Sequence, residues 1–147
     1  MEQFKGKYVR PWGDENIFGD RGLPAVEITA KEGDKFHIKM ECPVMDIKVK
    51  LDEEIEKPTY NGPHGYLVSF ESRGRRRRRG EVSTGKVVIV QQPKDKSIDF
   101  STKVTLELVK DHEYNHNPTR APWIMLVKTM IFGGNEEIKH VQKLKKV

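Results

Sequence analysis

Residues 24–60 read PAVEITAKEGDKFHIKMECPVMDIKVKLDEEIEKPTY, and four short runs within them alternate apolar and polar side chains. Alternation with a period of two is typical of strands that have one buried and one solvated face. Turns at residues 32–34 and at Cys42 and Pro43 separate the runs, which predicts an antiparallel meander. The apolar members of the first three runs are Val26, Ile28 and Ala30, then Phe36, Ile38 and Met40, and then Met45, Ile47, Val49 and Leu51.

The remainder of the chain continues this pattern and shows almost no helical periodicity. Further strands are expected at residues 4–9, 66–71, 86–91, 98–109, 123–132 and 138–147. Residues 12–23 leave room for a turn or two of helix, and residues 58–65, 72–85, 93–96 and 110–122 read as connections. The run 123–132 contains one charge, Lys128, which allows both of its faces to be covered.

Ten strands in one meander predict an all-β fold. Closing a ten-stranded antiparallel sheet into a β-barrel removes its exposed edges, and a barrel of that size encloses an internal cavity. An open two-sheet sandwich is the alternative. The length of 147 residues fits a single domain that spans residues 1–147.

The composition indicates a chain without internal disulfide bonds and without apolar segments long enough to span a membrane. Cys42 is its one cysteine, so an internal disulfide is excluded, and no apolar run is long enough to span a bilayer. The first ten residues lack the apolar core of a secretion signal, so a cytoplasmic location is expected. The net charge of +5 arises from 27 basic and 22 acidic residues.

The basic excess lies in one segment, RGRRRRRG. Without its run of five arginines the chain has 22 residues of each sign. Such a dense run of like charges is expected to be extended and mobile in a long hairpin loop. It could contact nucleic acid or an anionic membrane, or act as a localisation tag, and the alternative is a solvated loop. The candidate anion-binding residues are Arg73, Arg75, Arg76, Arg77, Arg78 and Arg79.

Three segments carry a resemblance to a known family: FKGKY at residues 4–8, PAVEITAKEGDKFHIKMEC at 24–42, and IKVKLDEEIE at 47–56. In order and spacing they resemble the intracellular fatty-acid-binding and cellular retinoid-binding proteins of the calycin superfamily. The resemblance is clearest over residues 24–56. It implies a monomeric cytoplasmic β-barrel that encloses and transports a small hydrophobic ligand, such as a fatty acid, a retinoid or another lipid.

Two departures from that family affect the expected ligand. Residues 6–24 are too short for both helices of the family's lid. Gln142, Lys143 and Leu144 stand where the family has Arg-x-Tyr, and Leu106 stands near its other internal arginine. A guanidinium binds a carboxylate strongly, whereas an amide offers neutral hydrogen bonds. A neutral or weakly polar lipid is therefore the expected ligand, with Gln142 and Tyr8 orienting its head.

The inward faces of the expected strands supply the other candidate ligand contacts, although the same residues could simply pack a core. Together with the two polar residues, the candidates are Tyr8, Phe36, Ile38, Met40, Ile47, Val49, Leu51, Phe70, Phe100, Leu106, Gln142 and Leu144.

Metal binding and catalysis have little support in the sequence. His112 and His116 have helical zinc-site spacing, but Asn115, Asn117 and Pro118 argue against a helix, so no metal and no cofactor are expected. No nucleophile motif or phosphate-binding loop is present. The leading hypothesis is a lipid-binding protein rather than an enzyme. The alternatives are an interaction module that uses the arginine-rich loop, and a small enzyme acting on a lipid-like substrate.

Overall fold

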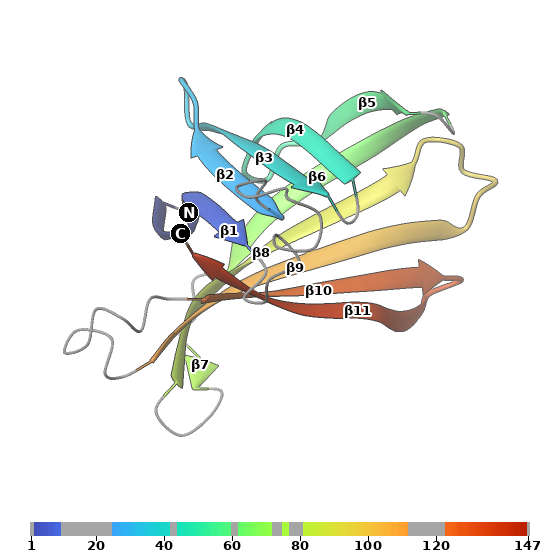
Figure 1. Cartoon of the computed structure of the whole chain (residues 1–147). Helices are drawn as coiled ribbons and strands as arrows, with labels where there is room; N and C mark the ends of the chain where they lie inside the picture. The colour runs from blue at the N-terminus through green and yellow to red at the C-terminus, as the bar shows by residue number, and fades with distance from the viewer. Residues whose placement is uncertain are drawn as a thin grey trace, which may run out of the picture.

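A computed structural model describes residues 2–9, 25–41, 44–59, 62–71, 75–76, 81–111 and 123–146 (Figure 1). Nearly all of these residues lie in strands. None of the helical segments within these ranges has the length and apolarity needed to span a bilayer. The elements are a 3-10 helix at Glu2–Phe4 and the strands β1 (Gly6–Val9), β2 (Val26–Ala30), β3 (Lys35–Glu41), β4 (Val44–Lys50), β5 (Ile55–Thr59), β6 (Gly62–Glu71), β7 (Arg75–Arg76), β8 (Glu81–Pro93), β9 (Phe100–Asp111), β10 (Trp123–Phe132) and β11 (Asn135–Lys146).

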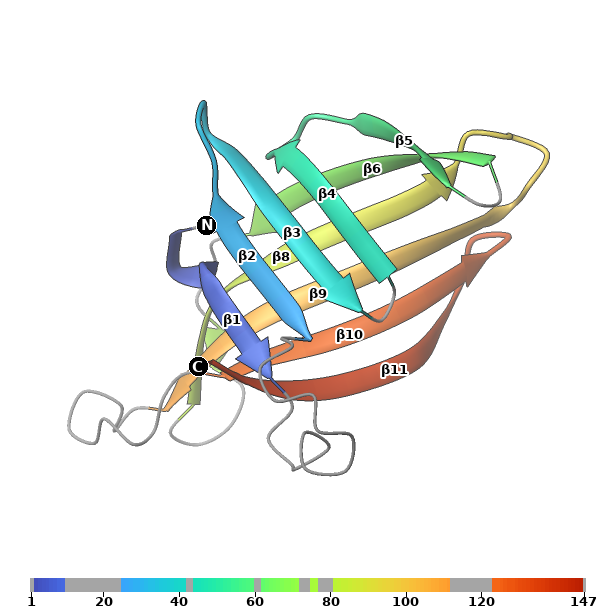
Figure 2. The same cartoon turned by 45° about the horizontal axis from the view of Figure 1, so that its top comes forward.

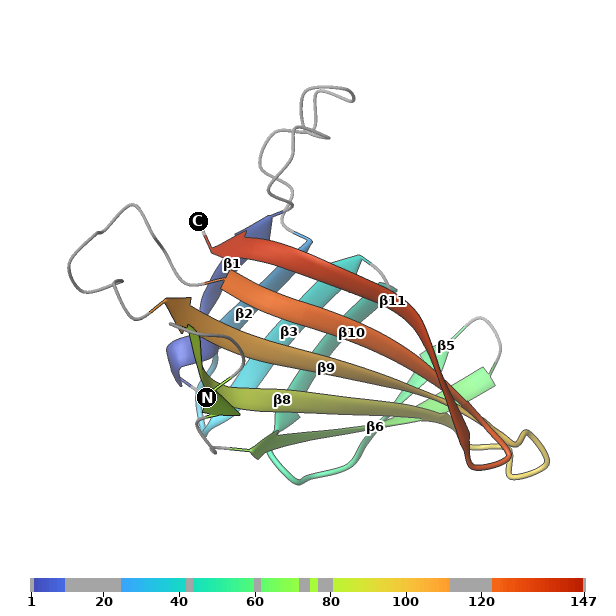
Figure 3. The same cartoon turned by 90° about the horizontal axis from the view of Figure 1, so that it is seen from below.

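The strands form one antiparallel sheet that is nearly closed into a barrel. Its order is β4, β3, β2, β1, β11, β10, β9, β8, β6, β5, and the two-residue β7 pairs with β8. The sheet comes closest to closing where β4 approaches β6. There the backbone N–H of Asp52 donates to the carbonyl of Val68 at 2.8 Å. Figures 2 and 3 show the wall β1–β4 crossing the long strands β8–β11. The predicted ten-stranded barrel is confirmed.

The alternating residues of segment 24–60 form β2, β3 and β4, as expected. Phe36, Ile38 and Met40 are buried on β3, and their polar neighbours are exposed or half-buried. The turn after β2 places Gly33 and Asp34 at φ of 71° and 61°, in the left-handed region that turns require. The other expected turn, at Cys42 and Pro43, lies outside the described residues, as do residues 12–23.

Several expected strand boundaries were wrong, because pairing lengthens some strands and ends others earlier than the alternation indicates. Residues 58–65 form a hairpin rather than a loop, since β5 runs to Thr59 and β6 begins at Gly62. Pro58 is tolerated because β5 is an edge strand, where a missing N–H breaks no ladder. Ile98 lies in the turn before β9 and is 44% exposed. Phe4 ends the 3-10 helix, Ala30 is exposed at the end of β2, and Leu51 lies in the turn after β4.

A single apolar cluster lies between the two walls. Its fully buried side chains come from both walls, so the inner faces pack against each other. Burying a side chain of this size contributes about 1.5–3 kcal/mol. The largest members with under 2% exposure are Tyr8, Phe4, Ile28, Ile38, Ile47, Ile89, Leu106, Leu108, Ile124 and Leu144.

Candidate ligand site on the inner face of the barrel

The cross-strand registers fix which side chains share the inner face of β6, β8, β9, β10 and β11. The alternation that buries Val104, Leu106 and Leu108 on β9 sets the face, and neighbouring strands follow it residue by residue. Three successive inner rows, each read from β6 to β11, are Tyr66, Gln91, Thr102, Met130 and Glu137; then Val68, Ile89, Val104, Lys128 and His140; then Phe70, Val87, Leu106, Leu126 and Gln142.

On β10 and β11 the exposure of the inner side chains rises from one end of the barrel to the other, whereas on β6 and β9 the inner residues Tyr66 and Thr102 are only 5% and 6% exposed. On β10 the inner residues Ile124 and Leu126 are 0% and 2% exposed, Lys128 is half-buried, and Phe132 is 50% exposed. On β11 Leu144 is buried, whereas Gln142 and His140 are half-buried. The interior is therefore sealed beside Phe4 and Tyr8, and it opens toward the β10–β11 hairpin.

Polar side chains on the inner face gather in the open half. The amide Nε2 of Gln91 donates to the Tyr66 hydroxyl at 3.1 Å, and Thr102 contacts the sulfur of Met130 at 3.6 Å. Burial raises the pKa of Tyr66, and the hydrogen bond from Gln91 opposes that shift. A hydroxyl and an amide at the edge of an apolar interior can orient a ligand that is otherwise held by apolar contacts.

A second polar group lies across the same face on β10 and β11. His140 Nε2 and Gln142 Oε1 are 3.3 Å apart, and Lys128 is the direct cross-strand neighbour of His140. Lys128 also neighbours Val104, which is fully buried. The group Lys128, His140 and Gln142, called the β10–β11 polar group below, brings a cation and an amide to the open half of the barrel.

Tyr8 is placed differently from its expected role. Its ring is 0% exposed, and its hydroxyl donates to the carbonyl of Phe4 at 2.8 Å. Burial raises the pKa of this hydroxyl well above the ordinary tyrosine value. The hydroxyl thus stabilises the sealed end of the barrel and already has a protein partner.

Tyr8→Phe should lower the free energy of unfolding by about 1 kcal/mol at neutral pH, because it removes one buried hydrogen bond. The raised folded-state pKa makes the Tyr8 contribution complete below pH 10 and lost as the pH rises further. Urea unfolding at pH 7 and pH 11 should therefore show a smaller difference between wild type and variant at pH 11. A change in lipid affinity above threefold would instead support the head-group role predicted for Tyr8.

The structure places the other predicted ligand contacts on inner faces, but at different depths. Ile38, Ile47, Val49, Leu106 and Leu144 have 0–1% exposure and pack within the core, and Phe36 and Met40 are nearly as buried. Phe70 packs edge-to-face on Phe4, with ring centroids 5.8 Å apart. Phe100 lies at the open end against Phe132, at 5.0 Å. Leu51 is half-buried beside the core, and Gln142 belongs to the β10–β11 polar group.

Sequence reasoning missed Tyr66, Gln91, Lys128 and His140 as inner-face residues. For Lys128 a signal existed, because it continues the alternation of Ile124 and Leu126. For His140 a signal also existed, because it continues the alternation of Gln142 and Leu144. A bulge between His140 and Ile138 ends that alternation, so that Glu137 rather than Ile138 lies on the inner face nearer the hairpin.

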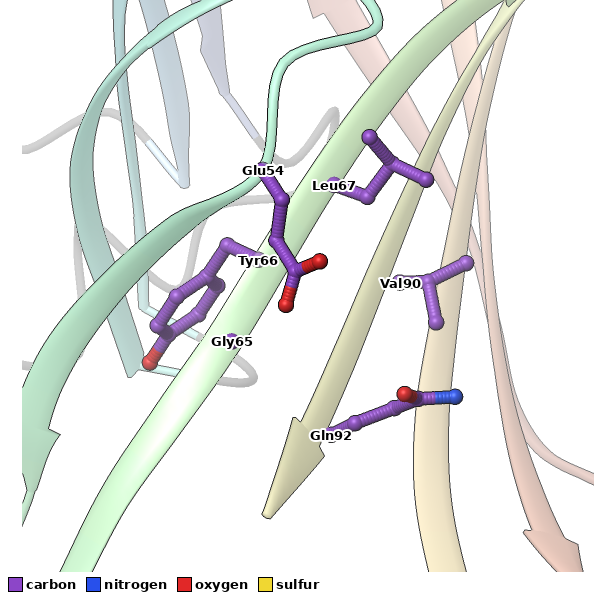
Figure 4. A pocket seen from close by; sticks show the side chains of 6 residues that line it. All are labelled: Glu54, Gly65, Tyr66, Leu67, Val90 and Gln92. Carbon is purple, nitrogen blue, oxygen red and sulfur yellow. The ribbon is translucent and has the colours of Figure 1, made fainter. Parts of the chain in front are cut away.

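Two depressions on the outer surface are less suited to a lipid. One, of about 120 Å³, lies outside β6 and β8 and is drawn in Figure 4. It is smaller than the roughly 300 Å³ at which ligand pockets begin, and Glu54 at its edge is paired with Lys94 at 2.5 Å. The other, of about 430 Å³, lies over β1 and β2 and carries the charged residues Lys5, Lys7 and Glu27.

The arginine-rich segment begins as a strand. Arg75 and Arg76 form β7 and pair with Ser83 and Val82 of β8. Figure 1 shows β7 at the opposite end of β8 from the β8–β9 hairpin. Arg73, Arg77, Arg78 and Arg79 lie outside the described residues, so their predicted contacts stay predictions.

Within the described ranges no three His, Cys, Asp or Glu side chains are grouped to hold a metal ion. His112 and His116 lie outside those ranges. No protein-family model matches the sequence. A search of curated proteins finds no significant relative.

Proposed function

We propose that this protein binds one small hydrophobic ligand inside its barrel and carries it through water. The observation that carries the proposal is the rise in exposure of the inner side chains on β10 and β11, from a sealed apolar core to half-buried hydrogen-bonding groups. A protein whose barrel interior only packed a core has no need of a histidine, two amides and a lysine on that face. The resemblance to the intracellular lipid-binding family over residues 24–56 supports the same function.

The rise in exposure also suggests how a ligand would be oriented. Its apolar part would displace water from the half-exposed rim and lie against side chains such as Met130 and Phe100. Burial of apolar surface contributes about 25 cal/mol per Å², so a chain of several methylenes supplies most of the affinity. Its polar head would lie near the rim, where Gln91, Tyr66 and Gln142 offer hydrogen bonds.

Displacement of Nile red from delipidated protein tests the proposal. We expect saturable binding of the dye with one site per chain, and displacement by a long-chain lipid such as oleyl alcohol or oleate. Mass spectrometry should then recover the lipid unchanged and in stoichiometric amount, whereas conversion of the lipid would indicate an enzyme. Absence of saturable binding to a folded, delipidated sample would contradict the proposal.

A second candidate function concerns the arginine-rich hairpin. Because β7 lies at the opposite end of β8 from the β8–β9 hairpin, a contact made by the arginine-rich hairpin can be independent of ligand binding in the barrel. Replacing Arg75, Arg76, Arg77, Arg78 and Arg79 with serine should abolish any salt-dependent binding to anionic vesicles or RNA and leave Nile red binding unchanged. Equal binding of the wild-type protein and the serine variant to anionic vesicles and to RNA would rule out a binding role for the arginine-rich hairpin.

A further inference from the structure

We propose that two copies of this chain associate through the edge of β11 that faces away from β10, with the two β11 strands antiparallel and related by a two-fold axis at His140. The proposal is independent of ligand binding, and it departs from the monomer that the family resemblance implies. It rests on a long strand edge that carries exposed apolar residues and opposite charges placed symmetrically about its middle.

β11 is paired over its whole length on one side, but only at its C-terminal end on the other. Between Asn135 and Lys145 its residues pair with β10, apart from the bulge. On the other side, the pairing within the described ranges consists of Lys145 with Val9 and Lys146 with Tyr8. Figure 2 shows β1 beside only the C-terminal end of β11. Such an edge presents backbone N–H and C=O groups with which a further strand can pair.

The side chains along this edge are exposed on both faces of the sheet. Ile138 and Val141 are 64% and 57% exposed, and Glu137 on the inner face is exposed as well. Val141 lies beside the half-buried Val127 of β10, so apolar surface continues inward from the edge. Continuous exposed apolar surface is typical of an interaction site.

The bulge between Ile138 and His140 makes the edge nearly symmetric. The register with β10 places Ile138 and Val141 both on the outer face. Without the extra residue, Lys139, they would lie on opposite faces, because they are three positions apart. In both directions from His140 the strand therefore presents an outer apolar residue, then an inner polar residue, then an outer charged residue.

A second copy placed antiparallel on this edge, with His140 opposite its own equivalent, brings three kinds of favourable pair together. On the outer face an apolar residue meets an apolar residue and a carboxylate meets an ammonium, and on the inner face a carboxylate meets an amide. Two-fold symmetry forms each pair twice. The pairs are Ile138 with the partner's Val141, Glu137 with the partner's Gln142, and Glu136 with the partner's Lys143.

The charge in the bulge is already neutralised within the strand. Lysines on strand edges ordinarily prevent edge-to-edge pairing. Lys139 lies in the bulge, but its ammonium is 2.7 Å from Oε1 of Glu137. The paired segment also ends at Lys143, before the residues that pair with β1. A second strand can therefore approach the edge without meeting an unpaired cation at its centre.

The charge on Lys143 is the one that a second copy would neutralise. Its ammonium lies 4.3 Å from the ring centroid of Trp123, and no carboxylate in the described part of the chain pairs with it. Glu136 accepts from Lys103 through Oε1 at 3.1 Å. A carboxylate has two acceptor oxygens, so Glu136 can hold Lys103 of its own chain and also bind the ammonium of a second copy.

Sedimentation velocity of the full chain tests the proposal. The wild-type protein should show a monomer–dimer equilibrium with a Kd below about 0.1 mM. Lys143→Glu and Glu136→Lys each place like charges opposite one another at both ends of the interface, so each should weaken association about tenfold. The double variant Glu136→Lys/Lys143→Glu restores opposite charges, and its Kd should return to within about threefold of the wild-type value.

The two single variants control for general charge effects, because they change the net charge in opposite directions. A general effect would strengthen association of Lys143→Glu, which lowers the positive charge. Lys48→Glu, the same exchange on the exposed face of β4, should change the Kd by less than about threefold. A thermal melt of each variant checks folding.

Two results would overturn the proposal. One is a wild-type protein that stays monomeric at about 0.3 mM, which requires no variant. The other is a dimer whose affinity the double variant does not restore, since that dimer uses another surface. Nile red binding is measured separately, and its absence would contradict the proposed ligand binding while leaving the association through β11 intact.

Discussion

Leu106→Ala is expected to lower the free energy of unfolding by about 3 kcal/mol, within the range of roughly 2–5 kcal/mol for deletion of a buried leucine. Leu106 lies in the middle of β9, and its inner-face neighbours are Val87 on β8 and Leu126 on β10. Its side chain is 0% exposed, and both neighbours are 0–2% exposed. The surrounding strands are paired on both sides, so they can close little of the space left behind.

Urea unfolding followed by circular dichroism measures this effect, and Leu67→Ala provides the matched control. Leu67 is a leucine on the adjacent long strand β6, but it lies on the outer face and is 41% exposed. Its replacement should change stability by less than about 1 kcal/mol. A similar loss for both variants would mean that the interior around Leu106 is not the packed core described above.

The Leu106 variant also bears on ligand binding. Sequence reasoning placed Leu106 in contact with ligand, whereas the structure packs it in the sealed half of the interior. If ligand occupies only the open half, Leu106→Ala should leave the affinity for Nile red within threefold once the folded fraction is taken into account. A larger change would show that ligand reaches the deep half.

Gly85→Ala is the second variant with a large expected effect, again about 3 kcal/mol of destabilisation. Gly85 lies at a bulge, where one extra residue of β8 is inserted between Ser83 and Lys86. Its φ of +139° is strained for any residue with a side chain, at roughly 1–3 kcal/mol. A Cβ there would also lie 2.7 Å from the backbone carbonyl oxygen of Glu71.

The ring of Phe70 makes this clash hard to relieve. A Cβ at position 85 would lie 2.9 Å from two of its carbons, and Phe70 packs on Phe4, which is 0% exposed. Gly33→Ala is the control, since Gly33 has a φ of +71° and no atom within 4 Å of a built Cβ. It should lose only about 1 kcal/mol from backbone strain. Equal losses in urea unfolding would assign the whole Gly85 effect to φ rather than to contact.

The two variants that are expected to lower the free energy of unfolding most, Leu106→Ala and Gly85→Ala, lie in the same half of the barrel. Leu106 and Gly85 both lie toward the sealed end, whereas the polar inner residues Tyr66, Gln91, Lys128 and His140 lie nearer the hairpins. This arrangement places the residues that stabilise the barrel apart from the residues proposed to bind ligand. Variants of Lys128 and His140 are therefore better suited to binding experiments than variants of Gln142, which shares an inner row with Leu106.

The sequence by itself determined the strands and the closed sheet. Alternation in residues 24–60 depends on neighbours two positions apart, so it is readable without any tertiary information, and it correctly placed Phe36, Ile38, Met40, Ile47 and Val49 on one face. Strand ends were less accurate, as at Gly62 and Phe100, because partner strands rather than local residues decide where pairing stops.

Only the tertiary structure decided the composition of the candidate site. Lys128 and His140 become neighbours through the β10–β11 register, and that register depends on a bulge for which the alternation gives no signal. The division into a sealed and an open half arises because residues far apart in sequence, such as Phe4, Tyr8 and Phe70, pack together at one end. Periodicity assigns residues to a face, whereas packing between walls sets how deep each one lies.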